Sequence, residues 1–106
     1  MAERHYQAYL IKKLRSMFDG IVILKNDSGY MAGIPDLSLF YGPHWAMLEV
    51  KAYANAPFQP NQEYYLEQLN AMSFAACIYP ENEDEVLSAL QQTFGLRGPA
   101  RLAKRK

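Results

Sequence analysis

Apolar positions in the first 18 residues follow the three- and four-residue spacing of a helix with one apolar face. They are Tyr6, Tyr9, Leu10, Leu14, Met17 and Phe18. This spacing predicts an amphipathic helix over residues 3–18. Asp19 and Gly20 follow at once, and a glycine there can take the left-handed conformation that ends many helices.

The rest of the chain alternates short apolar runs with helical patterns. The runs that predict strands cover residues 21–24, 36–41, 45–52 and 74–79. Two further helices are predicted, one over 61–72 with Pro60 in its first turn and one over 83–94. Asn82 and Glu85 have the spacing of a capping box at the start of the last helix. The order α-β-β-β-α-β-α predicts an α/β fold in which helices flank a mixed sheet, with the strand order left open.

Length and composition limit the classes of protein to consider. The 106 residues suit one domain, which we place at residues 1–96, and half of them are hydrophobic. No apolar run approaches the length of a membrane span and no secretory signal is recognisable, so we expect no membrane association. The single cysteine, Cys77, cannot form an internal disulfide and is expected to be a core residue. It fits a reducing compartment such as the cytoplasm.

Charge is unevenly distributed, although the formal net charge is zero. Residues 97–106 carry five of the eleven Lys and Arg and no acid, which leaves six bases against eleven acids, or −5, in the remainder. A basic terminal segment is typical of a flexible arm that contacts an anionic partner such as nucleic acid. A solubilising tail without a partner fits the same composition.

The segment GIPDLSLFYGPHWAMLEVKA, residues 33–52, places charged residues in an otherwise apolar hairpin. A two-residue turn at 42–43 would put Asp36 opposite Glu49, with Cβ atoms about 5 Å apart. Lys51 lies two residues beyond Glu49 and therefore projects from the same face. We expect the three polar groups to meet at one end of the hairpin, with Lys51 exposed at the strand end.

Two opposed carboxylates repel each other, so the pair predicts a stabilising cation. Mg²⁺ prefers oxygen ligands and supplies an activated water for phosphodiester hydrolysis, which Lys51 could orient or deprotonate. The alternative is purely structural, with Asp36 at a strand end and Glu49 on a solvated edge. Gly33 and Pro35 favour the functional interpretation, because proline fixes the backbone before the acid and glycine admits a close neighbour.

The segments GIPDL and LEVK, in this element order, resemble the PD-(D/E)XK nuclease superfamily. Within it, the chain is most similar to the small stand-alone VRR-NUC proteins of phages and bacteria, which are related to Holliday junction resolvases. The resemblance covers residues 3–95 and includes Gln62, where the VRR-NUC group has a glutamine at the start of a helix. It implies a restriction-endonuclease-like αβββαβ core.

Position by position, the resemblance implies a role for each motif residue. Asp36 and Glu49 would ligate Mg²⁺ or Mn²⁺, together with the backbone carbonyl of Val50. Lys51 would position the attacking water and stabilise the developing charge. Gln62 would assist at the metal or the phosphate, although a glutamine at a helix start can also bond its own backbone.

Glu3 in the first helix matches a metal-linked glutamate of archaeal-type Holliday junction resolvases. The resemblance implies a contribution to the metal through a water or a second ion. The preference of helix N-termini for acids explains a glutamate at this position equally well.

Candidate nucleic-acid contacts fall in the first helix and in the loop before the hairpin. They are Lys12, Lys13, Arg15, Lys25, Ser28 and Tyr30. Such side chains commonly contact phosphates, but a solvated helix face and a plain surface loop are the alternatives. Tyr53, Phe58, Tyr64 and Tyr65 are expected to pack in the core or in a dimer rather than to stack on bases.

Together these features predict a metal-dependent DNA endonuclease. The resemblance points to branched DNA such as Holliday junctions and to a homodimer, whose paired sites would suit a two-fold junction. A nicking, flap-cleaving or non-specific duplex nuclease is the first alternative. A non-catalytic nucleic-acid-binding protein of the same fold is the second.

Overall fold

The computed structural model describes residues 2–95, so the basic segment 97–106 lies outside the described residues. The elements are α1 (Glu3–Met17), β1 (Val22–Lys25), β2 (Leu37–Tyr41), β3 (His44–Val50), α2 (Gln62–Met72), β4 (Ala75–Ile78), the short 3₁₀ helix η1 (Pro80–Asn82) and α3 (Glu83–Thr93). The predicted element order is therefore confirmed, with boundaries that shift by a few residues at most. Among residues 2–95, no helix has the length and apolar character that a membrane crossing requires.

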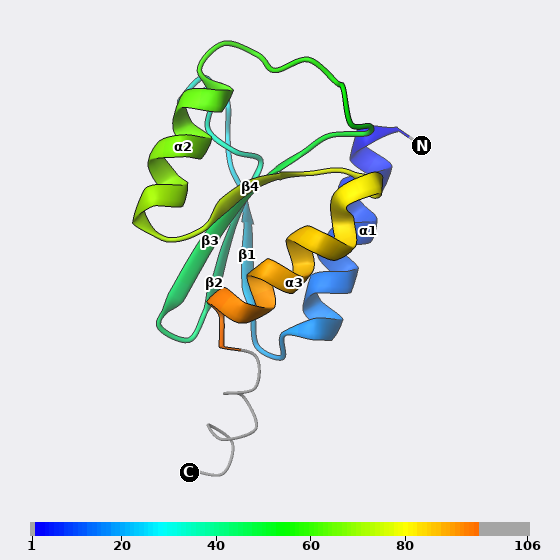
Figure 1. Cartoon of the computed structure of the whole chain (residues 1–106), viewed down its shortest axis with the longest axis vertical. Coiled ribbons are helices and arrows are strands. Elements are labelled where there is room, and N and C mark those ends of the chain that lie inside the picture. The colour runs from blue at the N-terminus through cyan, green and yellow to red at the C-terminus, as the bar shows by residue number, and fades with distance from the viewer. Residues whose placement is uncertain (1, 96–106) are drawn as a thin grey trace, which may run out of the picture.

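The four strands form one mixed sheet in the order β1-β2-β3-β4. Strands β1, β2 and β3 pair antiparallel, and β4 pairs parallel to β3 after the crossover through α2. Helices α1 and α3 lie side by side on one face of the sheet, and α2 lies on the other (Figure 1). The prediction of an α/β fold with a mixed sheet is confirmed, and the structure adds the strand order.

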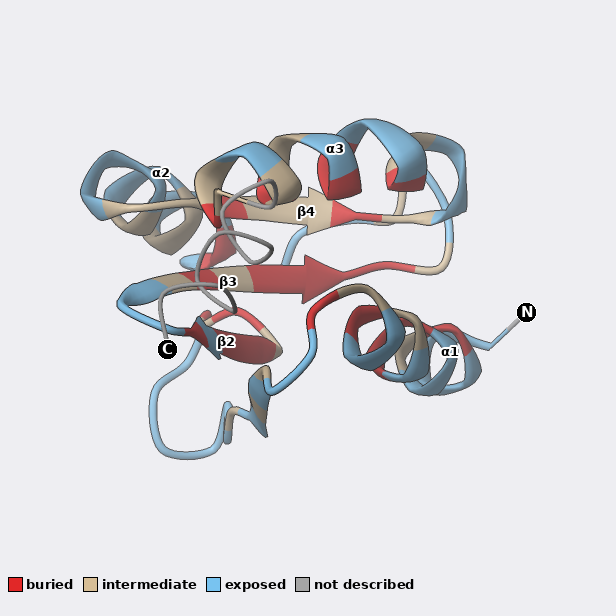
Figure 2. Cartoon of the chain, turned by 90° about the horizontal axis from the view of Figure 1, so that it is seen from below, coloured by how far each residue is buried: buried red, intermediate tan, exposed pale blue. Residues whose placement is uncertain are grey.

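The apolar core lies between the sheet and the α1–α3 pair. Alternate residues of β2 and β3 face this side, and Leu37, Leu39 and Leu48 are fully buried there. Leu10 and Leu14 of α1 pack against them in the same cluster. Figure 2 shows the contrast, with β3 buried along much of its length and α2 largely exposed. One face of the sheet thus holds the core, which leaves the other face available for polar groups.

A buried carboxylate joins the two helices of the core face. Glu83, the first residue of α3, accepts hydrogen bonds from the hydroxyls of Tyr6 (2.8 Å) and Tyr9 (3.0 Å). Lys13 of α1 forms an ion pair with it at 2.6 Å. Burial opposes ionisation, but these three donors outweigh it and lower the pKa of Glu83. Lys13, a candidate DNA contact, is thus engaged in an ion pair within the protein, with one-third of its side chain still exposed.

The capping box predicted for the last helix is wrong at the level of side chains. Asn82 makes no capping bond to α3. Its side chain instead closes η1, accepting from the Tyr79 N–H (2.9 Å) and donating to the Cys77 carbonyl (3.0 Å). Tyr53, Phe58 and Tyr64 are exposed, which excludes packing in the core and leaves packing in a dimer as a prediction.

The sheet face opposite the core is open beyond α2. Val22, Leu24 and Phe40 are 53%, 51% and 41% exposed. Val22 pairs with Phe40 across β1 and β2, so the three side chains share one face. Since β1 is also a terminal strand of the sheet, apolar surface and an unpaired strand edge occur together at this end.

We expect Tyr6→Phe to destabilise the fold at pH 7 by about 1.5–3 kcal/mol, because it removes a buried hydrogen bond to a charged acceptor. The loss should shrink as the pH falls through the lowered pKa of Glu83. Urea unfolding measures both effects. Tyr64→Phe, on the exposed surface of α2, is the matched control. Equal losses from the two variants would contradict the role given to Glu83.

Candidate active site

The hairpin has the register that its turn length predicts. Tyr41 faces His44 across the turn, and the last pair of β2 and β3 is Leu37 with Leu48. Continuing this register places Asp36 opposite Glu49. The Asp36 carboxylate accepts the backbone N–H of Val50 at 2.8 Å, which fixes one of its oxygens at the end of β3.

Glu49, Gln62 and Lys51 form one buried hydrogen-bonded network. The Gln62 amide donates to Glu49 Oε2 at 2.7 Å and accepts from Lys51 Nζ at 3.0 Å. Lys51 Nζ lies 3.4 Å from Glu49 Oε2. Gln62 Oε1 also accepts the Gln59 N–H at 2.7 Å, so this side chain bonds the backbone before its own helix as well as the two charged groups of the site. The structure brings the three predicted residues together.

Lys51 is buried, and the expectation of an exposed lysine is wrong. Only 6% of the residue is accessible, because the loop after β3 folds over it. Its Nζ donates to the Pro57 carbonyl at 3.2 Å and lies 5.5 Å from the centre of the Phe58 ring. The sequence offered no signal that Pro57 would supply this acceptor. Lys51 is thus held by the loop and by α2 as well as by its own strand.

The backbone before Asp36 is fixed by the side chain of Asn26. The Asn26 side chain donates to the Pro35 carbonyl at 2.8 Å, and its backbone N–H donates to the Asp36 carbonyl at 2.8 Å. The Ser38 hydroxyl donates to the same side chain at 3.0 Å. Asn26 therefore positions the strand that presents Asp36.

Gly33 makes the close contact that was expected of it. Its φ is +91°, and a Cβ added there would lie 2.6 Å from Asn61 Cβ and 2.9 Å from the Pro60 carbonyl oxygen. Asn61 itself has a φ of 71°, just before α2 begins. The loop before the hairpin thus rests directly on the start of the helix that carries Gln62.

These elements enclose a hollow of about 410 Å³, which we call the carboxylate hollow. Its lining comprises Glu3, Ser28, Ala32, Gly33, Ile34, Asp36, Glu49, Lys51, Gln59, Pro60 and Gln62. Glu3 therefore reaches the same space as Asp36 and Glu49, from the first turn of α1. The hollow is formed by segments spread over most of the chain, which is a common property of enzyme sites.

Burial dominates the electrostatics of the hollow. It raises the pKa of Glu49 to about 7, with repulsion from Asp36 adding to the effect and Lys51 opposing it. Burial also raises the pKa of Asp36, against the Val50 N–H and Lys51. Cys77 is half-buried beside Glu49, and burial raises its pKa to about 11. A thiol held protonated in this way is a poor nucleophile.

The donor set fits a divalent cation. Glu49 Oε1 is buried and has no hydrogen-bond partner, so the site has an acceptor that a cation would satisfy. Asp36 has one oxygen engaged by Val50, and Mg²⁺ is typically held by one or two carboxylates with waters completing its shell. Within residues 2–95, no three His, Cys, Asp or Glu side chains already form a cluster.

The basic candidates for nucleic-acid contact do not join this hollow. Lys12 and Arg15 are exposed, about 14–18 Å along α1 from Glu3 at 1.5 Å per residue. Lys25 is exposed at the end of β1. Of the candidates, only Ser28 lines the carboxylate hollow, whereas Tyr30 lines a neighbouring one.

Comparison of the chain with protein-family models, with curated proteins and with solved structures found no match. The motif and the geometry of the hollow are therefore the basis for assigning a function.

Gly33→Ala should loosen the contact between the loop and α2. Gly20 also has a positive φ (+84°), but a Cβ there meets nothing within 4 Å. Gly20→Ala thus isolates backbone strain, which we expect to cost about 1–2 kcal/mol. We expect Gly33→Ala to cost about 1–3 kcal/mol more, because its clash is with backbone atoms. If Gly33→Ala and Gly20→Ala lower the free energy of unfolding in urea equally, the contact between Gly33 and the start of α2 is not tight.

Glu49→Gln should stabilise the metal-free protein in a pH-dependent way. An acid whose folded pKa lies above its unfolded value destabilises the fold once it ionises, over about pH 4.5 to 7. We expect the variant to exceed wild type by up to roughly 3 kcal/mol at pH 8 and by much less at pH 5. Urea unfolding in EDTA measures this difference. Glu67→Gln, on exposed α2, controls for the lost charge, and a gain independent of pH would contradict the burial argument.

Proposed function

We propose that the protein is a metal-dependent endonuclease of the PD-(D/E)XK superfamily, similar to its VRR-NUC group, with a restriction-endonuclease-like core. One observation carries the proposal: two carboxylates, a lysine and a glutamine from separate elements line one hollow, where Glu49 has a buried oxygen without a partner. A solvated strand edge, the structural alternative for Glu49 and Lys51, is inconsistent with exposures of 2% and 6%.

In this proposal Asp36 and Glu49 hold Mg²⁺ or Mn²⁺ with the Val50 carbonyl, and the bound ion supplies an activated water and neutralises phosphate charge. Lys51 stabilises negative charge on the phosphate and orients the water. Gln62 keeps Lys51 and Glu49 at hydrogen-bonding distance from one amide. Glu3 would contribute through a water of the metal shell or through a second ion, and its presence in the lining of the same hollow supports this role.

We further propose that the substrate is branched DNA, such as a Holliday junction, and that the protein acts as a homodimer. The open sheet face with Val22, Leu24 and Phe40 supports self-association, because exposed apolar clusters commonly mark protein interfaces. A two-fold dimer presents two sites in the symmetric relation that paired strand cuts require.

The test is cleavage of a labelled four-way junction beside a linear duplex built from the same arms. Each is incubated with Mg²⁺, Mn²⁺ or EDTA and with wild type, Asp36→Asn or Glu49→Gln. We expect paired symmetric cuts in the junction that EDTA abolishes and that either variant reduces at least about 100-fold, as for removal of a group that stabilises the transition state. Glu67→Gln, an exposed glutamate of α2, should cleave like wild type.

Each other outcome removes part of the proposal. Cuts in both DNAs would keep the nuclease and reject junction selectivity. No cuts by folded wild type with either metal would reject the nuclease and favour a binding protein. Lys51→Ala is a poor test, because truncating a buried lysine leaves the Glu49 carboxylate without its positive partner and risks unfolding.

A further inference from the structure

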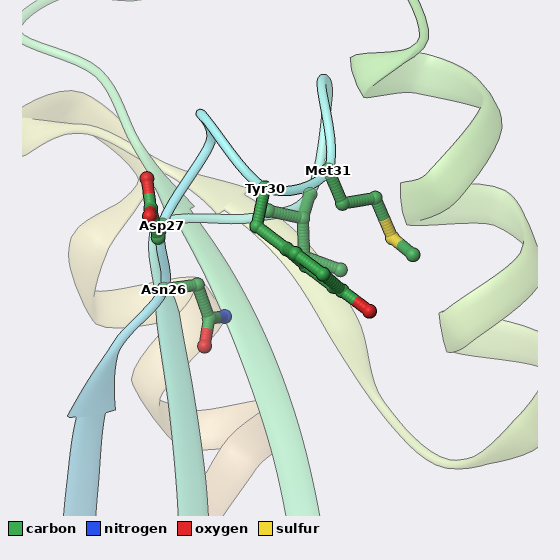
Figure 3. Close-up of a pocket in the computed structure, with 5 residues that line it drawn as sticks. Asn26, Asp27, Tyr30 and Met31 are labelled. Carbon is green, nitrogen blue, oxygen red and sulfur yellow. The ribbon is translucent and has the colours of Figure 1, made fainter.

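A second hollow adjoins the carboxylate hollow, and the proposed nuclease chemistry does not use it. It measures about 350 Å³, near the lower end of the roughly 300–1,000 Å³ typical of small-ligand sites. Its lining residues are Asn26, Asp27, Tyr30, Met31 and Ile34, and we call it the loop hollow. Figure 3 shows Tyr30 and Met31 extending from the loop above Asn26, with Met31 directed toward α2.

The surface of the loop hollow is apolar at its rim. Tyr30 is 86% exposed, the largest exposure among the big hydrophobic residues described, and Met31 is 37% exposed. Tyr30 and Met31 lie at the same hollow, and exposed apolar side chains that cluster in this way commonly mark a contact site. The ring and the thioether together offer a flat, polarisable surface of the kind on which a planar ligand can stack.

Polar groups of Asn26 and Asp27 hold the loop that forms this hollow. The Asn26 amide bonds Pro35 and Ser38, and Asp27 Oδ1 accepts the Gly29 N–H at 2.8 Å. Backbone bonds from Tyr30 to Asp27 and from Ile34 to Met31 close the loop further. These bonds hold the loop in one conformation, so the hollow is preformed.

Ile34 lines both hollows, so they adjoin across a single side chain. The carboxylate hollow takes a phosphodiester in the proposed function, and a nucleotide joins a phosphate to a planar base. We infer that the loop hollow binds an unstacked nucleobase next to the scissile phosphate, with its face on Tyr30 and Met31. This inference rests on the proposed function.

The inference explains how a small domain can select branched DNA. In a continuous duplex each base is paired and stacked, and extruding one costs a few kcal/mol. A nucleotide at a branch, bulge or loop is already partly unpaired or unstacked, so extruding its base costs less. The loop hollow would thus favour cleavage beside unpaired nucleotides with little preference for base identity, because every base has a π-face.

The experiment measures binding in EDTA, where no metal-dependent cleavage can occur. The probes are three labelled DNAs: a duplex with one unpaired nucleotide, the same duplex with that nucleotide abasic, and the fully paired duplex. Wild type should bind the first about 5- to 100-fold more tightly than the abasic form, which is the range of one stacked base. Tyr30→Ala should lose this difference and Tyr30→Phe should keep it.

Met72→Ala is the control for truncating an exposed apolar side chain, since Met72 is 69% exposed at the end of α2 and lines neither hollow. Equal wild-type affinity for the base-containing and abasic bulges, or no binding to any of the three DNAs, would overturn the inference. Base-dependent binding without cleavage in Mg²⁺ would keep the base site and reject the nuclease. Cleavage in Mg²⁺ by a protein that binds the base-containing and abasic bulges equally would keep the nuclease and reject the base site.

Discussion

The candidate active site is organised around one carboxylate, Glu49, which is buried with one oxygen lacking a hydrogen-bond partner. Glu49 lies on β3 with one oxygen bonded to Gln62 and the other bonded to nothing, while Lys51 provides the nearest positive charge. Buried ion pairs usually contribute little to stability, because desolvation offsets their attraction. The network therefore costs free energy of folding, which is the usual signature of a site retained for what it binds.

Apolar side chains on the opposite face of the same strands offset the free-energy cost of that network. Leu48 and Val50 alternate with Glu49 and are fully buried against α1 and α3. The sheet separates an apolar layer, which supplies hydrophobic stabilisation, from a polar layer that α2 covers only in part. Neighbouring residues of β3 thus have opposite effects on the free energy of folding: Leu48 and Val50 stabilise the fold, whereas Glu49 destabilises it.

Much of this was predictable from local rules. The turn at residues 42–43 and the period-two alternation were sufficient to place Asp36, Glu49 and Lys51 together, and Gly33 was recognised as a position of close approach. The burial of Lys51 was not predictable, because it depends on the irregular loop that brings the Pro57 carbonyl over it. Glu83 was also missed, since an acid at a helix start looks like ordinary dipole compensation, and its three donors come from residues 70 or more positions away.

The hairpin turn has a consequence for how the chain can vary. Surface turns are ordinarily the places where sequences gain and lose residues without harm. Here the register set by Tyr41 and His44 decides which face every residue of β3 occupies. A single inserted residue would carry Glu49 and Lys51 into the apolar layer and bring Leu48 and Val50 to the site. The length of this exposed turn is therefore as constrained as any side chain in the hollow, although the turn lies at the far end of the strands from it.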